Sequence, residues 1–205
     1  MKTKLFLLAL LISTVSFAQK KEKIKGNKFV KVKQHQVEDF SMLELGENLE
    51  VYLLKGQVPQ IEVEADENLH DVINFSVRSG ELSITTSHNI TSKKKLNIRI
   101  TYTDSFNTIV TKEKAVVNSL TDIDLDDLTI TAKDASKIFV TAKTNTFKLV
   151  SLKKSKVELN LNAKSTVVEM SESSDMKALI NSDKLAFDLY QKANAKIEGD
   201  VKQLT

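Results

Sequence analysis

Four similar blocks recur at nearly even intervals in the second half of the sequence. They read AKDASK (132–137), SLKKSK (151–156), SESSDM (171–176) and QKANAK (191–196). A short apolar run precedes and follows each block, and these runs alternate apolar with polar residues. A period near 20 indicates a solenoid in which each repeat makes one turn. Strands joined by corners, with no helical period, favour an all-β parallel β-helix.

Two other folds share parts of this pattern. A leucine-rich repeat has a similar period, but its L-x-x-L-x-L-x-x-N consensus is missing. An antiparallel sandwich of about eight strands stays open, because alternation alone also fits it. In the β-helix, we expect about five rungs from Phe106 onward. The side chains that should point inward as stacked ladders are Ile138, Val140, Phe147, Leu149, Val157, Leu159, Phe187 and Leu189.

The first half also consists of short period-two runs, with one exception. Runs such as 49–54, 61–64 and 96–102 alternate in the manner of half-buried strands. Residues 66–74 differ, because their apolar residues fall at helical spacing behind the acidic pair Asp66-Glu67. This segment predicts one short helix or helical turn.

The N-terminal residues predict export. A basic start precedes an apolar run at residues 5–15, which is shorter than the roughly 20 residues of a membrane-spanning helix. Small residues at Ser16 and Ala18 then fit a cleavage site before Gln19. We expect a signal peptide at 1–18, a flexible lead-in at 19–28, a single domain at 29–205 and no transmembrane segment.

The composition argues against disulfides, cysteine-bound metals, a lipid anchor and nucleic-acid binding. The sequence has no cysteine, so it has no disulfides and no cysteine-ligated metal. The lipidated cysteine of a bacterial lipoprotein is also missing, so we expect no lipid anchor. Without the two lysines of residues 1–18, the net charge falls from +3 to +1. Nucleic-acid binding proteins carry a marked basic excess, so we expect no nucleic-acid partner.

Several segments form a recognisable set. They are VEDF (37–40), LEVYLLKG (49–56), ADENL (65–69) and SGELSI (79–84), together with IKGN (24–27) and the corner DASK (134–137). This set resembles the head GIN domain family of auto-transporter adhesins. The resemblance implies an exported protein of a Gram-negative bacterium, with a right-handed β-helix and no assigned activity. The family's corners usually read Ser-Gly-Ala-Ser, but glycine is missing from the corners here. We therefore expect these corners to avoid positive φ, or to use Asn and Asp there.

Residues suited to catalysis or metal binding form no recognisable motif. His35, His70 and His88 lack ligand spacing, and the acidic run 122–127 lacks the glycine and glutamate of an EF-hand. We expect no metal, no cofactor and no enzymatic activity. A polysaccharide lyase or glycosidase is the alternative, since such enzymes group carboxylates in a groove. The strand carboxylates available for it are Glu158, Glu169, Asp188 and Glu198.

Two sets of lysines recur at intervals close to the repeat period. Lys137 and Lys156 form one set, and Lys143, Lys164 and Lys184 form the other. Stacked rungs would align each set as a positive stripe able to hold an anionic glycan. The alternative interpretation is that these charges keep the outer surface soluble.

The last repeat ends without an amphipathic helix to cover it. An uncovered strand edge is a template for a further strand, so this edge predicts self-association or docking of a partner strand. Its residues are Lys196, Ile197, Glu198 and Asp200. We therefore expect a binding, adhesion or structural module of the periplasm or outer cell surface, whose partner is a glycan or another envelope component.

Overall fold

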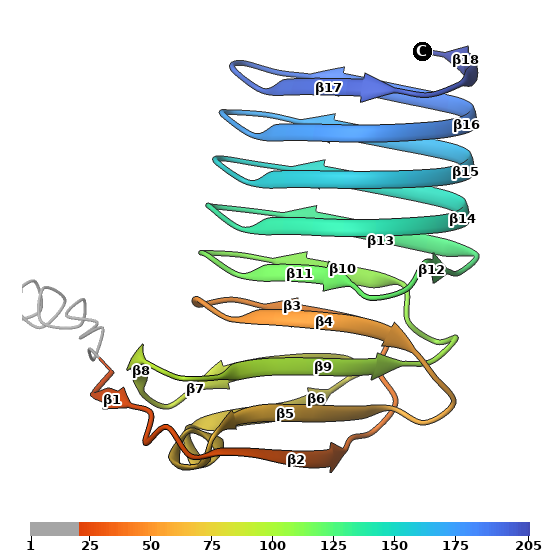
Figure 1. Ribbon diagram of the computed structural model, residues 1–205. Coiled ribbons are helices and arrows are strands. Elements are labelled where there is room, and N and C mark those ends of the chain that lie inside the picture. The colour runs from red at the N-terminus through yellow and green to blue at the C-terminus, as the bar shows by residue number, and fades with distance from the viewer. Residues whose placement is uncertain (1–20) are drawn as a thin grey trace, which may run out of the picture.

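The computed structural model describes residues 21–205, whose strands stack along one axis as a right-handed β-helix (Figure 1). We call one turn of this solenoid a rung. The β-helix predicted from the repeat is confirmed, and the antiparallel sandwich is excluded. The expected signal peptide, residues 1–18, lies outside the described residues. No helix in residues 21–205 has the length and apolar character needed to cross a membrane.

The lower rungs consist of short strands, whereas the upper rungs contain three strands of 15 residues together with further short strands. The lower strands are β1 (Lys23–Lys25), β2 (Val30–Gln36), β3 (Met42–Leu45), β4 (Glu50–Lys55), β5 (Gln60–Asp66), β6 (Ile73–Arg78), β7 (Glu81–Thr86), β8 (Asn89–Ser92) and β9 (Leu96–Tyr102). The upper strands are β10 (Thr108–Thr111), β11 (Val116–Ser119), β12 (Ile123–Asp124), β13 (Asp127–Ala132), β14 (Lys137–Ser151), β15 (Lys156–Met170), β16 (Asp175–Leu189), β17 (Asn194–Glu198) and β18 (Val201–Leu204).

The sequence repeat corresponds to the parallel stack of β14, β15 and β16. Each of these strands has 15 residues, and the strands pair in one register along almost their whole length. Ile138, for example, is the register partner of Val157, which is the partner of Met176. All three side chains are buried. The repeated apolar positions are thus the inward ladders of successive rungs.

The order of the rungs along the axis differs from the order of the sequence. Strand β4 pairs with β9 on one side and with β11 on the other. Likewise, β3 lies between β7 and β10. The rung formed by β3 and β4 is therefore inserted between two rungs that follow it in sequence (Figure 1).

Antiparallel strands close the lower end of the solenoid. Strand β5 pairs with β2 and β9, and β6 pairs with β7, all in antiparallel register. The helical turn predicted over residues 66–74 is a 3-10 helix, η1 (Glu67–Val72), with Leu69 and Val72 buried. These elements cover the apolar ladder at the bottom of the solenoid, in the manner of a terminal cap.

Six of the eight predicted core side chains are buried: Ile138, Val140, Phe147, Leu149, Val157 and Leu159. Phe187 is only half-buried, and Leu189 is 42% exposed. Leu189 is the register partner of Met170, whose side chain is fully buried. Leu189 thus has an inward position, but no rung covers it in the described part of the chain. The expectation that Leu189 is buried is wrong for this reason.

The corners adopt the backbone conformation that the missing glycines argued against. Asp134, Lys153, Glu172 and Gln191 have φ of 60°, 61°, 63° and 60° at the same corner of successive rungs. The expectation that these corners avoid positive φ is wrong, as is the expected restriction to Asn and Asp. Each corner closes with a backbone hydrogen bond, such as Ser155 N–H to the Leu152 carbonyl. Hydrogen bonds between successive corners, such as Ser173 N–H to the Lys153 carbonyl, stabilise this conformation. It costs about 1–2 kcal/mol for a residue other than glycine.

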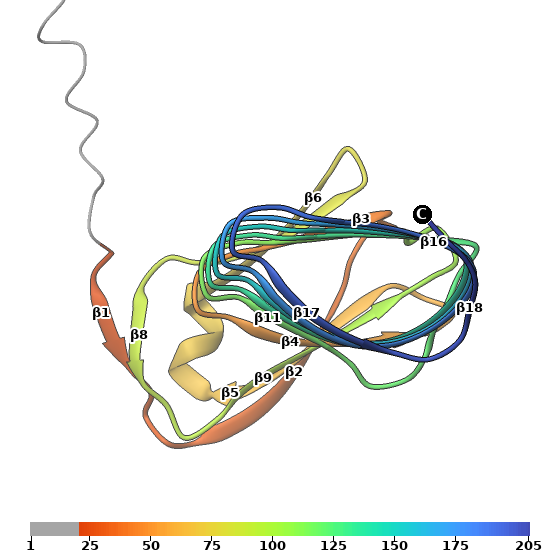
Figure 2. The same cartoon turned by 90° about the horizontal axis from the view of Figure 1, so that it is seen from above.

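The expected flexible lead-in is attached to the domain from Lys23 onward. Strand β1 pairs with β8 beside the solenoid (Figure 2). The buried carboxylate of Asp66 then accepts hydrogen bonds from the backbone N–H groups of Lys28, Lys94 and Lys95. One acidic side chain thereby joins the lead-in, β5 and the segment before β9.

Candidate functional site

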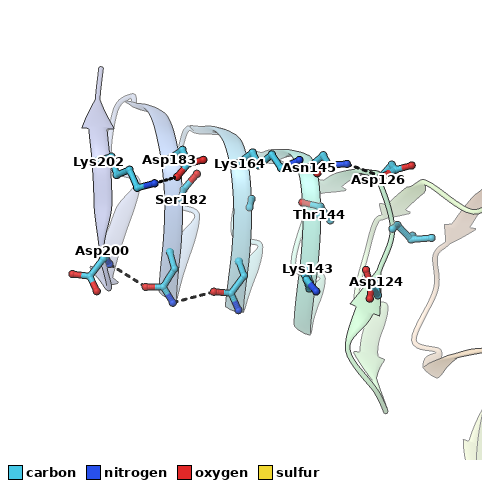
Figure 3. Close-up of a pocket in the computed structure, with 14 residues that line it drawn as sticks. Asp124, Asp126, Lys143, Thr144, Asn145, Lys164, Ser182, Asp183, Asp200 and Lys202 are labelled. Atoms are coloured by element: carbon cyan, nitrogen blue, oxygen red, sulfur yellow. Dashed lines mark hydrogen bonds and ion pairs between the residues drawn. The ribbon is translucent and has the colours of Figure 1, made fainter.

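A trough of about 510 Å³ runs along the solenoid axis where β14, β15 and β16 bend between their two faces (Figure 3). We call it the axial trough. Two rows of polar side chains form its walls, and Leu125, Thr144, Ala163 and Ser182 lie between the rows. One wall consists of Asp124, Lys143, Asn162, Asn181 and Asp200, and the other consists of Asp126, Asn145, Lys164, Asp183 and Lys202.

The first wall contains an amide ladder. Nδ2 of Asn181 donates to Oδ1 of Asn162 at 3.2 Å, and the backbone N–H of Asp200 donates to Oδ1 of Asn181 at 3.1 Å. Below Asn162, register continues the wall through Lys143 to Asp124. Because β15 and β16 stack in register, amides at equal positions of successive rungs meet without further support.

The second wall pairs charges and amides between neighbouring rungs. Nδ2 of Asn145 donates to Oδ1 of Asp126 at 2.6 Å, and Nζ of Lys202 lies 2.7 Å from Oδ1 of Asp183. The hydrogen bond and charge of Lys202 lower the pKa of Asp183, and the charge of Lys164 adds to this effect. These contacts join side chains of neighbouring rungs along the wall.

Small side chains between the walls leave room for a ligand. Thr144, Ala163 and Ser182 are register partners on three successive rungs. Thr144 and Ser182 are buried, and the Ser182 hydroxyl lies 2.9 Å from the Thr166 hydroxyl. Their inward orientation leaves the backbone of three rungs as the floor between the two walls.

The trough is close to electrically neutral, although it is highly polar. Four aspartates and three lysines line it, together with the amides of Asn145, Asn162 and Asn181. Carboxylates accept hydrogen bonds, ammonium groups donate them, and amides do both. Such a surface matches a ligand that presents many hydroxyl groups, because each hydroxyl both donates and accepts. It offers no excess of positive charge to attract a phosphate-rich ligand.

Register does not align the predicted lysine stripe of Lys143, Lys164 and Lys184. Lys143 pairs with Asn162 on the next rung, and Lys184 pairs with Ser165, so the three lysines stand in three different columns. Lys143 and Lys164 both line the axial trough, but in opposite walls, while Lys184 is outside it. The lysines are spaced more widely than the register step between rungs, so each lysine moves along its strand relative to the previous one.

The other predicted set, Lys137 and Lys156, is aligned by register, but the lysine column ends after these two residues. Lys137 and Lys156 are register partners, and the next residue in their column is Asp175. No chemical motif in the sequence predicts the wall residues Asn162 and Asn181. Their signal was the recurrence of asparagine one repeat later, which reads as corner chemistry until the register is known.

The carboxylates considered for polysaccharide cleavage do not gather in the axial trough. Glu169 and Asp188 are register partners on an exposed face, whereas Glu158 and Glu198 lie on another face. A glycosidase needs a general acid of raised pKa. Each described carboxyl group whose pKa is shifted has it lowered, as at Asp183 and Asp66.

Two of the three histidines, His35 and His70, pack against neighbouring elements of the lower rungs. His70 is buried, with Nε2 lying 3.1 Å from the Lys31 carbonyl, and the ring of His35 packs at 5.1 Å from Phe75. Burial, followed by the charges of His70 and Lys33, lowers the pKa of His35. Within residues 21–205, no three His, Asp or Glu side chains form a cluster suited to a metal ion.

A second groove of about 500 Å³ lies on the outer face of the upper rungs. Phe139, Glu158, Asn160 and Lys177 are among its lining residues. Asn160 is on the same strand as the trough residue Asn162, two positions away. It therefore presents the same amide to a different surface, which makes it a control for the trough.

A family model described as "Putative auto-transporter adhesin, head GIN domain" matches residues 39–160 of the chain. No curated protein matches the chain. Solved structures of similar fold include a putative adhesin from Bacteroides fragilis, with 15% identity, a TM-score of 0.65 and coverage of 89% of this chain and 100% of that one. At these identities, the structural likeness establishes the fold alone.

Two structures from Parabacteroides distasonis are also similar. One is described as a putative adhesin, with 12% identity and a TM-score of 0.59, and the other as a putative lipid binding protein, with 10% identity and a TM-score of 0.54. Each alignment covers 90% of this chain and 100% of the other. The same fold thus appears under two different functional descriptions.

Proposed function

We propose that this chain, which belongs to the head GIN domain family of auto-transporter adhesins, is a non-catalytic binding module of the cell envelope. Its ligand is a neutral glycan, bound along the axial trough. The protein is exported through cleavage after Ala18 and works in the periplasm or on the outer cell surface of a Gram-negative bacterium, without a lipid tether. The family membership supports an adhesive role, and the pattern of residues 1–18 supports export.

The observation that carries this proposal is the composition of the trough walls. Amides, carboxylates and ammonium groups occur along both walls, so each rung from Lys143 and Asn145 to Asp200 and Lys202 presents both donors and acceptors. Neighbouring rungs are about 4.8 Å apart, so a polymer lying along the axis meets similar groups at each step. Glycans are extended polymers with hydroxyl groups at every unit, which is the ligand geometry that this repetition suits.

The balance of charges in the axial trough favours a neutral glycan over an anionic one. A stripe of lysines would favour phosphate or uronate groups, but Lys202 is already paired with Asp183, and Lys164 lies near the same carboxylate. The lysines therefore act mainly as hydrogen-bond donors within a balanced wall. An acyl chain is a poor ligand here, because it would bury these charged groups without hydrogen bonds.

Affinity electrophoresis tests the proposal with the purified, exported protein. Native gels that contain one polysaccharide each, either neutral or anionic, are compared with gels that contain none. The expected result is retardation by at least one neutral polysaccharide that persists in about 0.15 M salt, because hydrogen bonding is screened less than surface charge. Retardation by anionic polymers only, abolished by salt, would contradict the neutral ligand. Release of new reducing ends would instead support the enzymatic alternative.

A further inference from the structure

The last rung of the described chain leaves its apolar ladder uncovered. Leu189 is 42% exposed and Leu204 is 68% exposed, whereas their register partners one rung below, Met170 and Leu185, are 0% and 3% exposed. Ile197 is half-buried, although it continues the same inward pattern. Within residues 21–205, no strand pairs with the upper edges of β17 and β18. The lower end, in contrast, is closed by antiparallel strands.

Charges on this open edge are arranged symmetrically about Ile197. Lys196 and Glu198 flank it, both point outward, and Nζ of Lys196 lies 2.9 Å from Oε1 of Glu198. If two copies of β17 pair in antiparallel register centred on Ile197, each Lys196 lies opposite a Glu198 of the other copy. The two Ile197 side chains then meet on the inner face, where they extend the apolar ladder.

The shape of the rung end fits the same symmetry. Strand β18 follows β17 in the same turn and pairs with β16, and it is raised relative to β17 because the chain advances along the solenoid axis. Residues 188–190, on the other side of β17, have no strand above them in the described chain. A helical ramp is unchanged by a twofold rotation perpendicular to its axis. A raised β18 in one copy therefore meets the lower residues 188–190 of the other, and the gap between the copies stays constant.

We propose that two copies of this chain join end to end through their last rungs, about a twofold axis at Ile197. The joint pairs β17 with its copy in antiparallel register and covers Leu189, Ile197 and Leu204. The dimer is a solenoid of double length, in which the two closed lower ends point outward. The predicted self-association edge, Lys196, Ile197, Glu198 and Asp200, is the joint in this arrangement.

Sedimentation velocity over a range of protein concentrations, with charge variants, tests both the dimer and its register. Wild-type protein should shift from monomer to dimer as concentration rises. Lys196→Glu and Glu198→Lys each place like charges opposite one another twice, so each should weaken dimerisation by about tenfold. The double variant Lys196→Glu/Glu198→Lys restores opposite charges and should dimerise like the wild type.

Two further variants separate the joint from general effects of charge. Lys177→Glu makes the same charge change one rung below Lys196, in the same outward column, and should leave dimerisation unchanged. Ile197→Lys should abolish dimerisation while the thermal unfolding of the monomer stays cooperative. A wild type that remains monomeric at every concentration would overturn the proposal, as would equal effects of Lys177→Glu and Lys196→Glu.

Discussion

Asn181 donates a hydrogen bond from Nδ2 to Oδ1 of Asn162 at 3.2 Å, so that amides at equal positions of neighbouring repeats form consecutive steps of one ladder. A primary amide has two N–H donors and two acceptor lone pairs. The ladder uses one N–H and one lone pair of Asn181, since its oxygen also accepts from the backbone of Asp200. Asn181 therefore keeps one N–H donor and one acceptor lone pair beyond the ladder, which together can serve one hydroxyl group of a ligand.

Substitutions in the covered and uncovered parts of the apolar ladder should change the free energy of unfolding by different amounts. Leu149→Ala should lower the free energy of unfolding by about 2–5 kcal/mol, because Leu149 is fully buried between two rungs. Leu189→Ala serves as the matched control, since Leu189 is inward by register but 42% exposed. It should cost clearly less. Equal losses in urea unfolding would contradict the assignment of the uncovered rung.

Asp66 should make the stability of the protein depend on pH. Burial tends to raise the pKa of Asp66, but hydrogen bonds from the backbone of Lys94, Lys95 and Lys28 outweigh it and lower that pKa below the ordinary value. The folded pKa is thus below the unfolded one, which is about 3.9. The stabilisation is complete above the unfolded pKa and is lost as pH falls through the folded one.

Asp66→Asn removes this contribution and places an amide where three N–H groups point. The variant should unfold more easily at pH 7, and its stability should fall less steeply than that of the wild type below about pH 5. Asp71→Asn is the control, because Asp71 lies nearby on η1 with an exposed side chain. Parallel pH profiles for wild type and Asp66→Asn, measured by chemical denaturation, would rule out this role.

Glycine at a corner should stabilise the protein. Glu172 has a φ of 63° at the second position of the turn between β15 and β16. Glu172→Gly relieves the left-handed conformation but adds freedom to the unfolded chain, with a net gain of about 0.5–1 kcal/mol. Ser173→Gly, at the next residue, has no positive φ to relieve and should destabilise. A lower melting temperature for Glu172→Gly would show that the corner is not strained.

The exported protein should begin at Gln19. The basic start, the apolar run and the small residues at 16 and 18 predict cleavage after Ala18. Mass spectrometry of the protein recovered from the periplasm or the medium, without detergent, should give the mass of residues 19–205. A Ser16→Arg/Ala18→Arg variant should retain the uncleaved mass. An intact Met1 on the recovered wild type would refute the signal peptide.

The β-helix could be predicted from the sequence because its period is expressed in the spacing of apolar residues. Val157 and Leu159, for example, are placed inward by alternation alone, and the structure agrees. The insertion of the β3–β4 rung between later rungs could not be predicted, since each short strand has the same pattern whichever neighbour it pairs with. Strands pair through backbone groups, so the sequence of a strand does not show which strand it pairs with.

The candidate site could be predicted only in part, because it depends on register to a single residue. The lysine spacing predicts Lys143 and Lys164 as exposed binding groups, and both line the axial trough. Their intervals suggested one stripe, but a difference of one or two positions between repeats moves a side chain to another column. The prediction for the corners is wrong for a related reason: the cost of a positive φ at Lys153 is local, but the stacking that stabilises this conformation is not.

The binding of glycan in the axial trough is tested most directly by removing its amides. The double variant Asn162→Ala/Asn181→Ala should lose the gel retardation that a neutral polysaccharide produces with the wild type, while thermal unfolding stays cooperative. Asn160→Ala, which removes an amide from the same strand outside the trough, should keep the full retardation. Full retardation of the double variant, or loss of retardation in Asn160→Ala alone, would contradict a binding site in the trough.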